Sequence, residues 1–433
     1  MKRLSFFIFI VFNLSVRSQT NVTTNILTST VWTQANSPYV LKNDIILYQG
    51  ATLNVQPGVE IQVDSGYKFN IEGILNLNGN PTDSILIHSS ATSPSRTYWY
   101  GISMNGQGKT SMKYTILQDS EHGLEHFNSA LPQTDSVFIT HSRFSHNSWA
   151  MSYMPLHPPY VFVTDCNFNN NNEGMRSMAN PGMWIQRCNF FNNTGGIGDT
   201  LGAGSLNVTI DNCNFYNNRV GASVNYDGPG GGVLNSNFYN NGFAGVNLTL
   251  EFTPHPFTNN RIYNNAVGVL CNVNISGADS LNGLNCAICS NTVNFKNTGG
   301  WNIQASNICW CSNDSATIRA GIIDGFNTNS LGLVFFSPYL LDCDLSNPAS
   351  IKQNDPSALL SVYPNPFTQD LYFTHADNLL PAQADVFDVM GRLVYSGRLT
   401  EKHLDLQFLK EGIYNIVLRG DTYSASKKII KLN

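Results

Sequence analysis

Cys188-Asn189-Phe190-Phe191-Asn192-Asn193-Thr194-Gly195 is one copy of a pattern that recurs along the middle of the chain. Other copies begin at Cys166, Cys213 and Ser236, and weaker copies begin at Ser142 and Asn260. The apolar residue at the third position falls at 144, 168, 190, 215, 238 and 262, which gives steps of 24, 22, 25, 23 and 24 residues. A repeat in the low twenties is typical of a solenoid, in which each turn of the chain packs only against its neighbours.

Each copy has the alternation of a half-buried β-strand, with Phe, Ile, Val and Tyr separated by Asn, Ser and Thr. One short unit cannot bury its apolar face alone, but stacked units form a continuous core. Leucine-rich repeats have a similar length, yet they need leucines at fixed positions, and these are missing from the sequence. We therefore predict an all-β fold: a right-handed parallel β-helix solenoid followed by a small C-terminal β-sandwich.

Stacking brings like residues into register at ~4.8 Å from coil to coil. The repeat positions expected to stack inward are Phe168, Phe190, Phe215 and Phe238 and, beside them, Cys166, Cys188 and Cys213. Parallel Cβ vectors suit a disulfide poorly, so these three cysteines are predicted to be free core thiols. Asn side chains are expected to bond to the Asn of the next coil. Glycines near the Asn pair are expected to adopt positive φ at the corner, at Gly195, Gly221, Gly242, Gly245 and Gly268.

The composition of the 433 residues favours a folded β protein. Charged residues make up 12% of the chain and the net charge is -5, so no basic surface for nucleic acid is expected. The 42% of hydrophobic and 11% of aromatic residues support a packed core rather than disorder.

Five segments are expected in chain order. Residues 1–18 have the features of an export signal, because Lys2 and Arg3 precede an apolar run that is too short to span a bilayer. Residues 19–136 are expected to form an N-terminal cap and the first coils, and residues 137–345 the repeats and a closing segment. A Ser-, Asn- and Pro-rich linker over 346–357 leads to a final domain over 358–433. No later segment is apolar for long enough to be an integral membrane segment after the signal is removed.

The opening coils resemble those of a known class of exported proteins. Residues 50–61 read Gly-Ala-Thr-Leu-Asn-Val-Gln-Pro-Gly-Val-Glu-Ile, and Gly73–Gly79 and Trp99–Ile102 follow. This passage is similar to the first coils of secreted right-handed β-helix proteins of the pectin-lyase-like class. Residues 307–343, with Trp310, are similar to the closing segment of many bacterial β-helices, which contains a short helix. The catalytic motifs of pectate lyases and polygalacturonases are missing, so the resemblance implies the fold and not their chemistry.

Four motifs at the C-terminus resemble the type A sorting domain of the type IX secretion system of Bacteroidota. They are Val362–Phe367 with Pro364, Asn365 and Pro366; Asp388–Val394 with Gly391 and Arg392; Leu409–Tyr414 with Gly412; and Lys427–Lys431 with Lys428. The resemblance implies export in two steps. A signal peptide takes the chain across the inner membrane, and the type IX secretion machinery reads the sorting domain at the outer membrane. The product is expected to be secreted or held on the outer cell surface.

Histidines and carboxylates gather before and within the first repeats. The candidate catalytic residues are His122, Glu125, His126, His141 and Asp165. In a lateral groove such groups could abstract the proton beside a uronate carboxylate, or protonate a glycosidic oxygen. A structural explanation stands beside this one, because His141 adjoins a repeat and His122 and His126 fall in an expected turn.

The cysteines late in the chain are expected to differ from the free thiols of the repeats. They are Cys271, Cys286, Cys289, Cys309, Cys311 and Cys343. The pairs Cys286-x-x-Cys289 and Cys309-x-Cys311 could hold zinc, but the second pair has one intervening residue instead of two. Disulfides near the closing segment are favoured in an exported protein, with buried thiols and zinc as the alternatives. We expect no metal and no cofactor.

The long stacked surface, without lyase or hydrolase motifs, favours a binding protein. We predict that the solenoid, as a monomer, binds a glycan or another surface polymer without catalysis. Exposed aromatic residues are the candidate sugar contacts: Tyr98, Trp99, Tyr100, Trp149, Tyr153, Tyr160 and Trp184. Proline-containing insertions at 152–159 and 251–256 are expected on the binding face. The alternatives are a polysaccharide lyase or glycoside hydrolase with a site in the histidine-rich coils, and a structural adhesin.

Overall fold

The computed structural model describes residues 19–105, 108–128, 137–153, 161–177, 183–198, 205–206, 208–226, 231–250, 256–273, 281, 285–341, 361–374, 382–388, 393–399, 402–419 and 424–432. The chain divides into two compact units, residues 1–349 and residues 350–433. Most of the expected insertion at 152–159 and most of that at 251–256 lie outside the described residues, as does the whole of the expected linker at 346–357.

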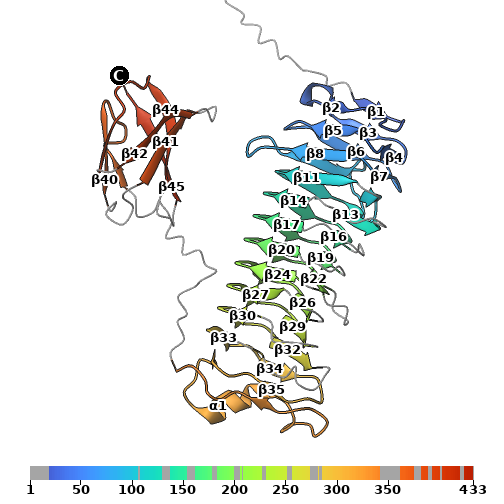
Figure 1. The fold of residues 1–433 in the computed structure, drawn as a ribbon, viewed down its shortest axis with the longest axis vertical. Coiled ribbons are helices and arrows are strands. Elements are labelled where there is room, and N and C mark those ends of the chain that lie inside the picture. The colour runs from blue at the N-terminus through green and yellow to red at the C-terminus, as the bar shows by residue number, and fades with distance from the viewer. Residues whose placement is uncertain are drawn as a thin grey trace, which may run out of the picture. The chain divides into compact units, whose positions relative to one another are not determined.

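The first unit is a parallel β-solenoid built from three long sheets, which we call sheets A, B and C (Figure 1). Each coil contributes one strand to sheet C, the next to sheet A and the next to sheet B, and every pairing between coils is parallel in the described part. The expected parallel β-helix is therefore confirmed.

The strands of sheet A are β1 (Thr20–Val22), β3 (Tyr39–Leu41), β6 (Glu60–Val63), β9 (Ile85–Ser89), β12 (Thr115–Gln118), β15 (Arg143–Ser145), β18 (Asn167–Asn169), β21 (Asn189–Phe191), β25 (Asn214–Tyr216), β28 (Asn237–Tyr239), β31 (Arg261–Tyr263), β33 (Cys286–Cys289) and β36 (Ile308–Cys309). Sheet B contains β4 (Ile45–Leu47), β7 (Lys68–Ile71), β10 (Trp99–Asn105), β13 (Ser120–Asn128), β16 (Trp149–Tyr153), β19 (Glu173–Ser177), β22 (Gly195–Ile197), β26 (Val220–Tyr226), β29 (Ala244–Leu250), β32 (Val267–Val273), β34 (Val293–Asn297) and β37 (Ile322–Ile323), with β23 (Ser205–Leu206) beside β26. Sheet C contains β2 (Thr30–Trp32), β5 (Thr52–Val55), β8 (Ile74–Asn78), β11 (Lys109–Lys113), β14 (Val137–Thr140), β17 (Val161–Thr164), β20 (Met183–Gln186), β24 (Val208–Asp211), β27 (Gly232–Leu234) and β30 (Phe257–Thr258).

The middle strand position of sheet A is a stack of buried phenylalanines. The rings of Phe144, Phe168, Phe190, Phe215 and Phe238 follow one another with centroid distances of 5.0, 4.7, 4.8 and 4.7 Å. Beside this stack, Cys166, Cys188 and Cys213 are buried and free. Burial raises the pKa of the Cys166 and Cys188 thiols well above the usual range. The predicted core positions and free thiols are confirmed.

A ladder of asparagines, all of them buried except the partly buried Asn291, follows the sheet A strands. Its members are Asn147, Asn171, Asn193, Asn218, Asn241, Asn265 and Asn291. The Oδ1 atom of Asn218 accepts the backbone N–H of Asn193 at 2.9 Å and its side-chain amide at 3.1 Å. That amide also donates to the carbonyl oxygen of Phe168, 2.9 Å away. The predicted Asn-to-Asn bonding is confirmed, and it also satisfies backbone groups that the bend would otherwise leave unpaired.

The role predicted for the glycines is wrong. The residues with positive φ at this corner are asparagines: Asn170, Asn192, Asn217, Asn240 and Asn264, with φ between 55° and 57°. Gly221 and Gly245 instead lie where successive coils approach closely. A Cβ atom on Gly221 would collide with the carbonyl oxygen of Gly245 and meet the Phe238 ring at 3.1 Å. Glycine is needed there for space, while asparagine accepts the left-handed conformation.

Both described ends of the solenoid are covered by aromatic side chains. Near the start, beside the short helix η1 (Gln34–Asn36), the Trp32 and Tyr39 rings stack with centroids 4.5 Å apart. Near the other end, helix α1 (Ser315–Ala320) begins at Asp314, whose carboxylate accepts backbone N–H groups of Ala316 and Thr317. Trp310 is buried beneath this segment, which also contains the paired strands β35 (Ile303–Gln304) and β38 (Val334–Phe335). The expected closing segment with a Trp and a short helix is confirmed.

The second unit contains two antiparallel sheets. One comprises β39 (Ser361–Tyr363), β40 (Asp370–Thr374) and β43 (His403–Asp405). The other comprises β42 (Leu393–Leu399), β41 (Ala382–Asp388), β44 (Gly412–Arg419) and β45 (Ser424–Lys431). They share a core that includes Phe367, Leu371, Val386 and Ile416. The predicted small all-β C-terminal unit is confirmed.

Candidate functional site

Two of the candidate catalytic residues meet on the outer face of sheet B. His122 and Glu125 lie in strand β13, so the turn expected for His122 and His126 is wrong. The Nδ1 atom of His122 lies 3.2 Å from Oε1 of Glu125. The hydroxyl of Tyr100, on β10, donates to Oε2 of the same carboxylate at 3.1 Å, and Ser103 lies 3.5 Å from it. Glu125 is 2% exposed, so this carboxylate is held by protein groups and not by bulk water.

Aromatic rings continue this cluster from coil to coil. The His122 ring lies between Tyr100 and Trp149, with centroid distances of 4.8 and 4.5 Å. Lys68 lies over the Tyr100 ring at 5.6 Å, and Arg176 lies over Trp149 at 5.9 Å. Three consecutive rings are therefore flanked by one cation at each end, and each cation lies where it is favourable for the quadrupole of the adjacent ring.

The electrostatics of the cluster keep Tyr100 protonated. Burial, together with the negative charge of Glu125, raises the pKa of Tyr100 to about 12. Nearby, the buried Oγ of Ser152 and Nε of Arg176 have no hydrogen-bond partner within the described residues. Buried polar atoms without partners are uncommon, and they cluster at functional positions often enough to mark this face as a candidate site.

His126 faces the opposite side of β13. It pairs in register with Met104 and follows Leu124 by two residues, and both of these belong to the core. Burial lowers the pKa of His126 to about 4, so the imidazole is neutral at physiological pH. The structure therefore separates His126 from the pair formed by His122 and Glu125.

His141 and Asp165 lie at a different corner, between sheets C and A. Both have positive φ, 50° and 56°, at equivalent positions of successive coils. The carboxylate of Asp165 accepts two hydrogen bonds of 2.8 Å from Arg187, and this bonding raises the pKa of the guanidinium. The ring of His141 stacks on Tyr114 with centroids 4.7 Å apart. The five candidates thus do not form one groove, and the sequence did not reveal that Tyr100 and Ser103 complete the His122 cluster.

Two rows of aromatic side chains lie on the outer surface. On sheet C, Phe138, Phe162 and Trp184 stack at 5.2 Å intervals, and Phe138 and Trp184 are 52% and 38% exposed. On sheet A the row is Phe191, Tyr216, Tyr239 and Tyr263, with intervals of 5.1, 5.1 and 5.2 Å. Each residue of this second row directly follows an interior anchor residue, which is the signal in the sequence that could have identified it. By contrast, Trp99 is buried in the core, and Tyr160 lies outside the described residues.

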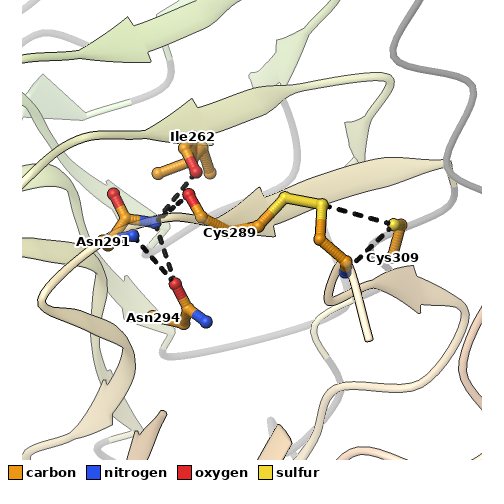
Figure 2. The surroundings of a disulfide bond; sticks show 6 residues. Ile262, Cys289, Asn291, Asn294 and Cys309 are labelled. Atoms are coloured by element: carbon orange, nitrogen blue, oxygen red, sulfur yellow. Dashed lines mark hydrogen bonds between the residues drawn. A yellow bond between two sulfur atoms is a disulfide. The ribbon is translucent and has the colours of Figure 1, made fainter. Parts of the chain in front are cut away.

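We call the sheet A row, Phe191, Tyr216, Tyr239 and Tyr263, the Tyr row. It ends at a pocket of about 320 Å³. Arg261, Tyr263, Ala287, Cys289, Ser290 and Cys311 line it. Cys289 and Cys311 form a disulfide, which confirms the prediction of a disulfide near the closing segment (Figure 2). Cys271 and Cys286 are instead buried and free, and burial raises the pKa of each to about 12. A zinc site from the two cysteine pairs is therefore wrong, and Cys343 lies outside the described residues.

In the C-terminal unit, the first and last sequence motifs lie side by side. The side-chain oxygen of Asn365 accepts the backbone N–H of Ile430 at 2.9 Å. Phe367 donates to the carbonyl of Ile430 and accepts from Leu432, at 2.9 and 2.8 Å. Pro364 and Pro366 flank this contact, while Gly412 and Tyr414 lie in β44 and pair with Lys431 and Ile429 of β45. Lys427 and Lys428 are also in β45, and Gly391 and Arg392 lie outside the described residues.

Two further observations concern the described residues alone. None of their helices has the length and hydrophobicity that crossing a membrane requires. Within the same part of the chain, no group of three or more His, Cys, Asp and Glu side chains is arranged to hold a metal ion.

Comparison with known proteins supports both units. The family described as secretion system C-terminal sorting domain matches residues 361–432, and the family described as right handed beta helix region matches residues 100–267. No curated protein matches the chain. Among solved structures, the chain is similar to the A-module of the Azotobacter vinelandii mannuronan C-5 epimerase AlgE6, at 12% identity and a TM-score of 0.35 over 67% of this chain and 82% of that one. The A-module of the epimerase AlgE4 from the same organism is also similar, at 12% identity and a TM-score of 0.32 over 76% of this chain and 90% of that one.

The residues that carry the sorting motifs thus fold as one small unit, and the repeats fold as coils. The chain is a right-handed parallel β-helix protein with a secretion system C-terminal sorting domain, which directs it to the cell surface or the medium.

Proposed function

We propose that the solenoid binds a polysaccharide or another surface polymer along its outer face without turning it over. The observation that carries this proposal is the pair of outward aromatic rows, whose members recur every 5.1–5.2 Å along the coils. An extended polymer presents similar groups at regular intervals, so a regular row can contact successive units. Aromatic side chains with a polar tip suit this, because the ring supplies apolar area and the hydroxyl supplies a hydrogen bond.

The hydroxyl groups of the Tyr row remain protonated at neutral pH. Burial raises the pKa of Tyr216 and Tyr263, and it raises that of Tyr239 to about 12, with the neighbouring tyrosines adding to the effect. Each phenol can therefore donate as well as accept. The ring faces inside the row are covered by the adjacent rings, so the edges and hydroxyls make the contacts. These contacts therefore differ from the stacking of a ring face on a sugar.

A second function is supported by the His122 cluster, where an imidazole, a carboxylate and a phenol meet within 3.2 Å. In this alternative His122 takes a proton from the substrate, Glu125 orients the imidazole, and Tyr100 donates a hydrogen bond. Such an arrangement suits proton abstraction beside a uronate carboxylate. It suits glycoside hydrolysis less well, since that reaction usually needs a pair of carboxyl groups across the scissile bond.

One experiment separates these functions. The mature chain, which we propose begins after residue 18, is incubated with a panel of acidic and neutral polysaccharides. Reducing ends and the ultraviolet absorbance of unsaturated uronates report cleavage, and affinity gel electrophoresis reports binding. Retardation without cleavage supports the binding proposal. Cleavage that is lost in His122→Gln would replace it with the enzymatic alternative, and the absence of both retardation and cleavage would reject both.

A further inference from the structure

The pocket at the end of the Tyr row arises from a step between two coils. In β31, Arg261 and Tyr263 both face outward on either side of the buried Ile262. In the next coil, Ala287 pairs in register with Arg261, and Cys289 pairs with Tyr263. Two large side chains thus lie beside two small ones, and the missing volume is the pocket of about 320 Å³. This volume lies at the lower end of the range for small-molecule sites.

The two sides of the Tyr263 ring have different surroundings. One side is stacked on Tyr239, with centroids 5.2 Å apart and an interplanar angle of 4°. On the other side the chain places Cys289 in register instead of another ring, and Tyr263 lines the pocket. The row therefore ends in an aromatic wall, which is the kind of surface on which the C–H face of a sugar packs.

Arg261 supplies a positive charge to the same pocket. At the equivalent positions of the preceding coils the residues are Asn189, Asn214 and Asn237, which bond to one another in a ladder. Arg261 pairs in register with Asn237, so a charged side chain follows the three asparagines at this position. A guanidinium group is suited to binding a carboxylate through two hydrogen bonds.

The wall opposite Tyr263 is held in place by covalent and hydrogen bonds. The disulfide joins Cys289 to Cys311, whose Cα atoms are 5.7 Å apart. The side-chain amide of Asn291 donates to the carbonyl oxygens of Cys289 and Ile262, at 3.1 and 2.9 Å (Figure 2). A wall fixed in this way is formed before any ligand arrives, which lowers the entropic cost of binding.

We propose that this pocket binds one uronate unit of an acidic polysaccharide, with the pyranose ring against Tyr263 and the carboxylate at Arg261. The inference rests on the proposed polymer binding, and it specifies a site and a class of ligand. Neutral sugars can use the aromatic wall but not the cation, so acidic chains are preferred. The preference falls as salt is added, because the exposed part of the interaction is screened.

The test uses the mature chain, an oligogalacturonate and a neutral β-galactan oligomer, with calorimetry as the readout. Arg261→Gln and Tyr263→Ala are expected to weaken oligogalacturonate binding by roughly tenfold or more, since each removes a main contact. Matched controls lie outside the pocket and outside both aromatic rows: Arg219→Gln, whose guanidinium lies over Phe243, and Tyr48→Ala, an exposed tyrosine in the first coils. These two are expected to leave the affinity for oligogalacturonate within about twofold of wild type.

The outcomes distinguish the inference from the proposed function. If the pocket variants bind oligogalacturonate as wild type does, or if wild type binds both oligomers equally, the pocket assignment is wrong while polymer binding stands. If wild type binds neither these oligomers nor any longer polysaccharide, both proposals are rejected. Arg261→Lys keeps the charge but loses the guanidinium group that can donate two hydrogen bonds to one carboxylate, so it is expected to retain part of the affinity. Tyr263→Phe keeps the ring, so it tests the wall even if Tyr263→Ala does not fold.

Discussion

Asn218 shows how much of the solenoid depends on single side chains. Its Oδ1 accepts two hydrogen bonds from Asn193, and its amide donates to the carbonyl oxygen of Phe190 at 2.9 Å. Asn218→Gly would leave these buried groups unpaired, so we expect a loss of roughly 2–5 kcal/mol in the free energy of unfolding. The neighbouring Asn217 is exposed and has φ of 55°, which glycine adopts without strain. Asn217→Gly should therefore unfold close to wild type, and equal losses in urea titrations of the two variants would contradict the ladder's role.

His126 makes stability depend on pH. Its pKa is lowered to about 4 in the folded protein by burial, against about 6.5 in an unfolded chain. As the pH falls below 6.5 the unfolded state binds the proton first, so stability is complete above about pH 7 and declines toward pH 4. Between pH 7.5 and pH 5 this group should cost about 2 kcal/mol.

Other groups titrate over the same range, so the measurement compares wild type with His126→Leu, which keeps an apolar side chain beside Met104. Urea unfolding at pH 7.5 and pH 5 is expected to show the smaller pH dependence in the variant. The same pH dependence in both proteins would show that His126 is not buried as a neutral group.

At the scale of strands and corners, glycine affects stability where two coils approach each other closely. We expect Gly221→Ala to destabilise the protein by about 2 kcal/mol or more, because its Cβ would collide with the Gly245 carbonyl in β29. At Gly242 the nearest atom to an added Cβ is the carbonyl oxygen of Asn218, at 3.9 Å. Gly242→Ala is therefore expected to stay within about 0.5 kcal/mol of wild type. Thermal unfolding of the two variants checks this, and a larger effect at Gly242 would contradict the close approach of the coils as the cause.

These elements also show what sequence reasoning can and cannot reach. The interior of sheet A was predictable, because Phe168, Phe190 and Phe215 recur at a nearly constant spacing. That spacing indicates that they stack on one another in successive coils. The space required at Gly221 was not predictable, since it depends on the distance between two coils. Strand β13 was missed for a related reason: it is longer than the sheet A strands of the repeats, and its register shifts against β10, so it carries no copy of the pattern.

For the candidate sites too, the sequence showed the residue types but not the contacts between coils. His122 and Glu125 were identified by residue type, but their meeting with Tyr100 depends on pairing between coils. The pocket at Tyr263 was not predicted, because no single stretch contains it. It forms from Arg261 and Tyr263 in one coil, the smaller residues of the next, and Cys311 beyond them.

For the whole molecule, the sorting signal and the candidate sites belong to two different compact units. The recognition motifs of the sorting signal are distant in sequence, yet Asn365 and Phe367 bond to Ile430 of the final strand, and Phe367 also bonds to Leu432 directly after it. The last residues therefore complete the fold of the sorting domain. A chain that lacks them should keep an intact solenoid but fail to be sorted.

We accordingly expect a chain that ends at residue 426 to remain in the periplasm of a host with type IX secretion, with a full-length solenoid. Asn365→Ala should lower the exported fraction, because the end of β45 loses a hydrogen bond worth about 1 kcal/mol. Gln369→Ala is the matched control, since it removes an exposed amide of the same loop and leaves the contact with Ile430 unchanged. Cell fractionation with immunoblotting measures the exported fraction of each. Export of the truncated chain at the wild-type level would show that the paired first and last motifs are not what the secretion machinery reads.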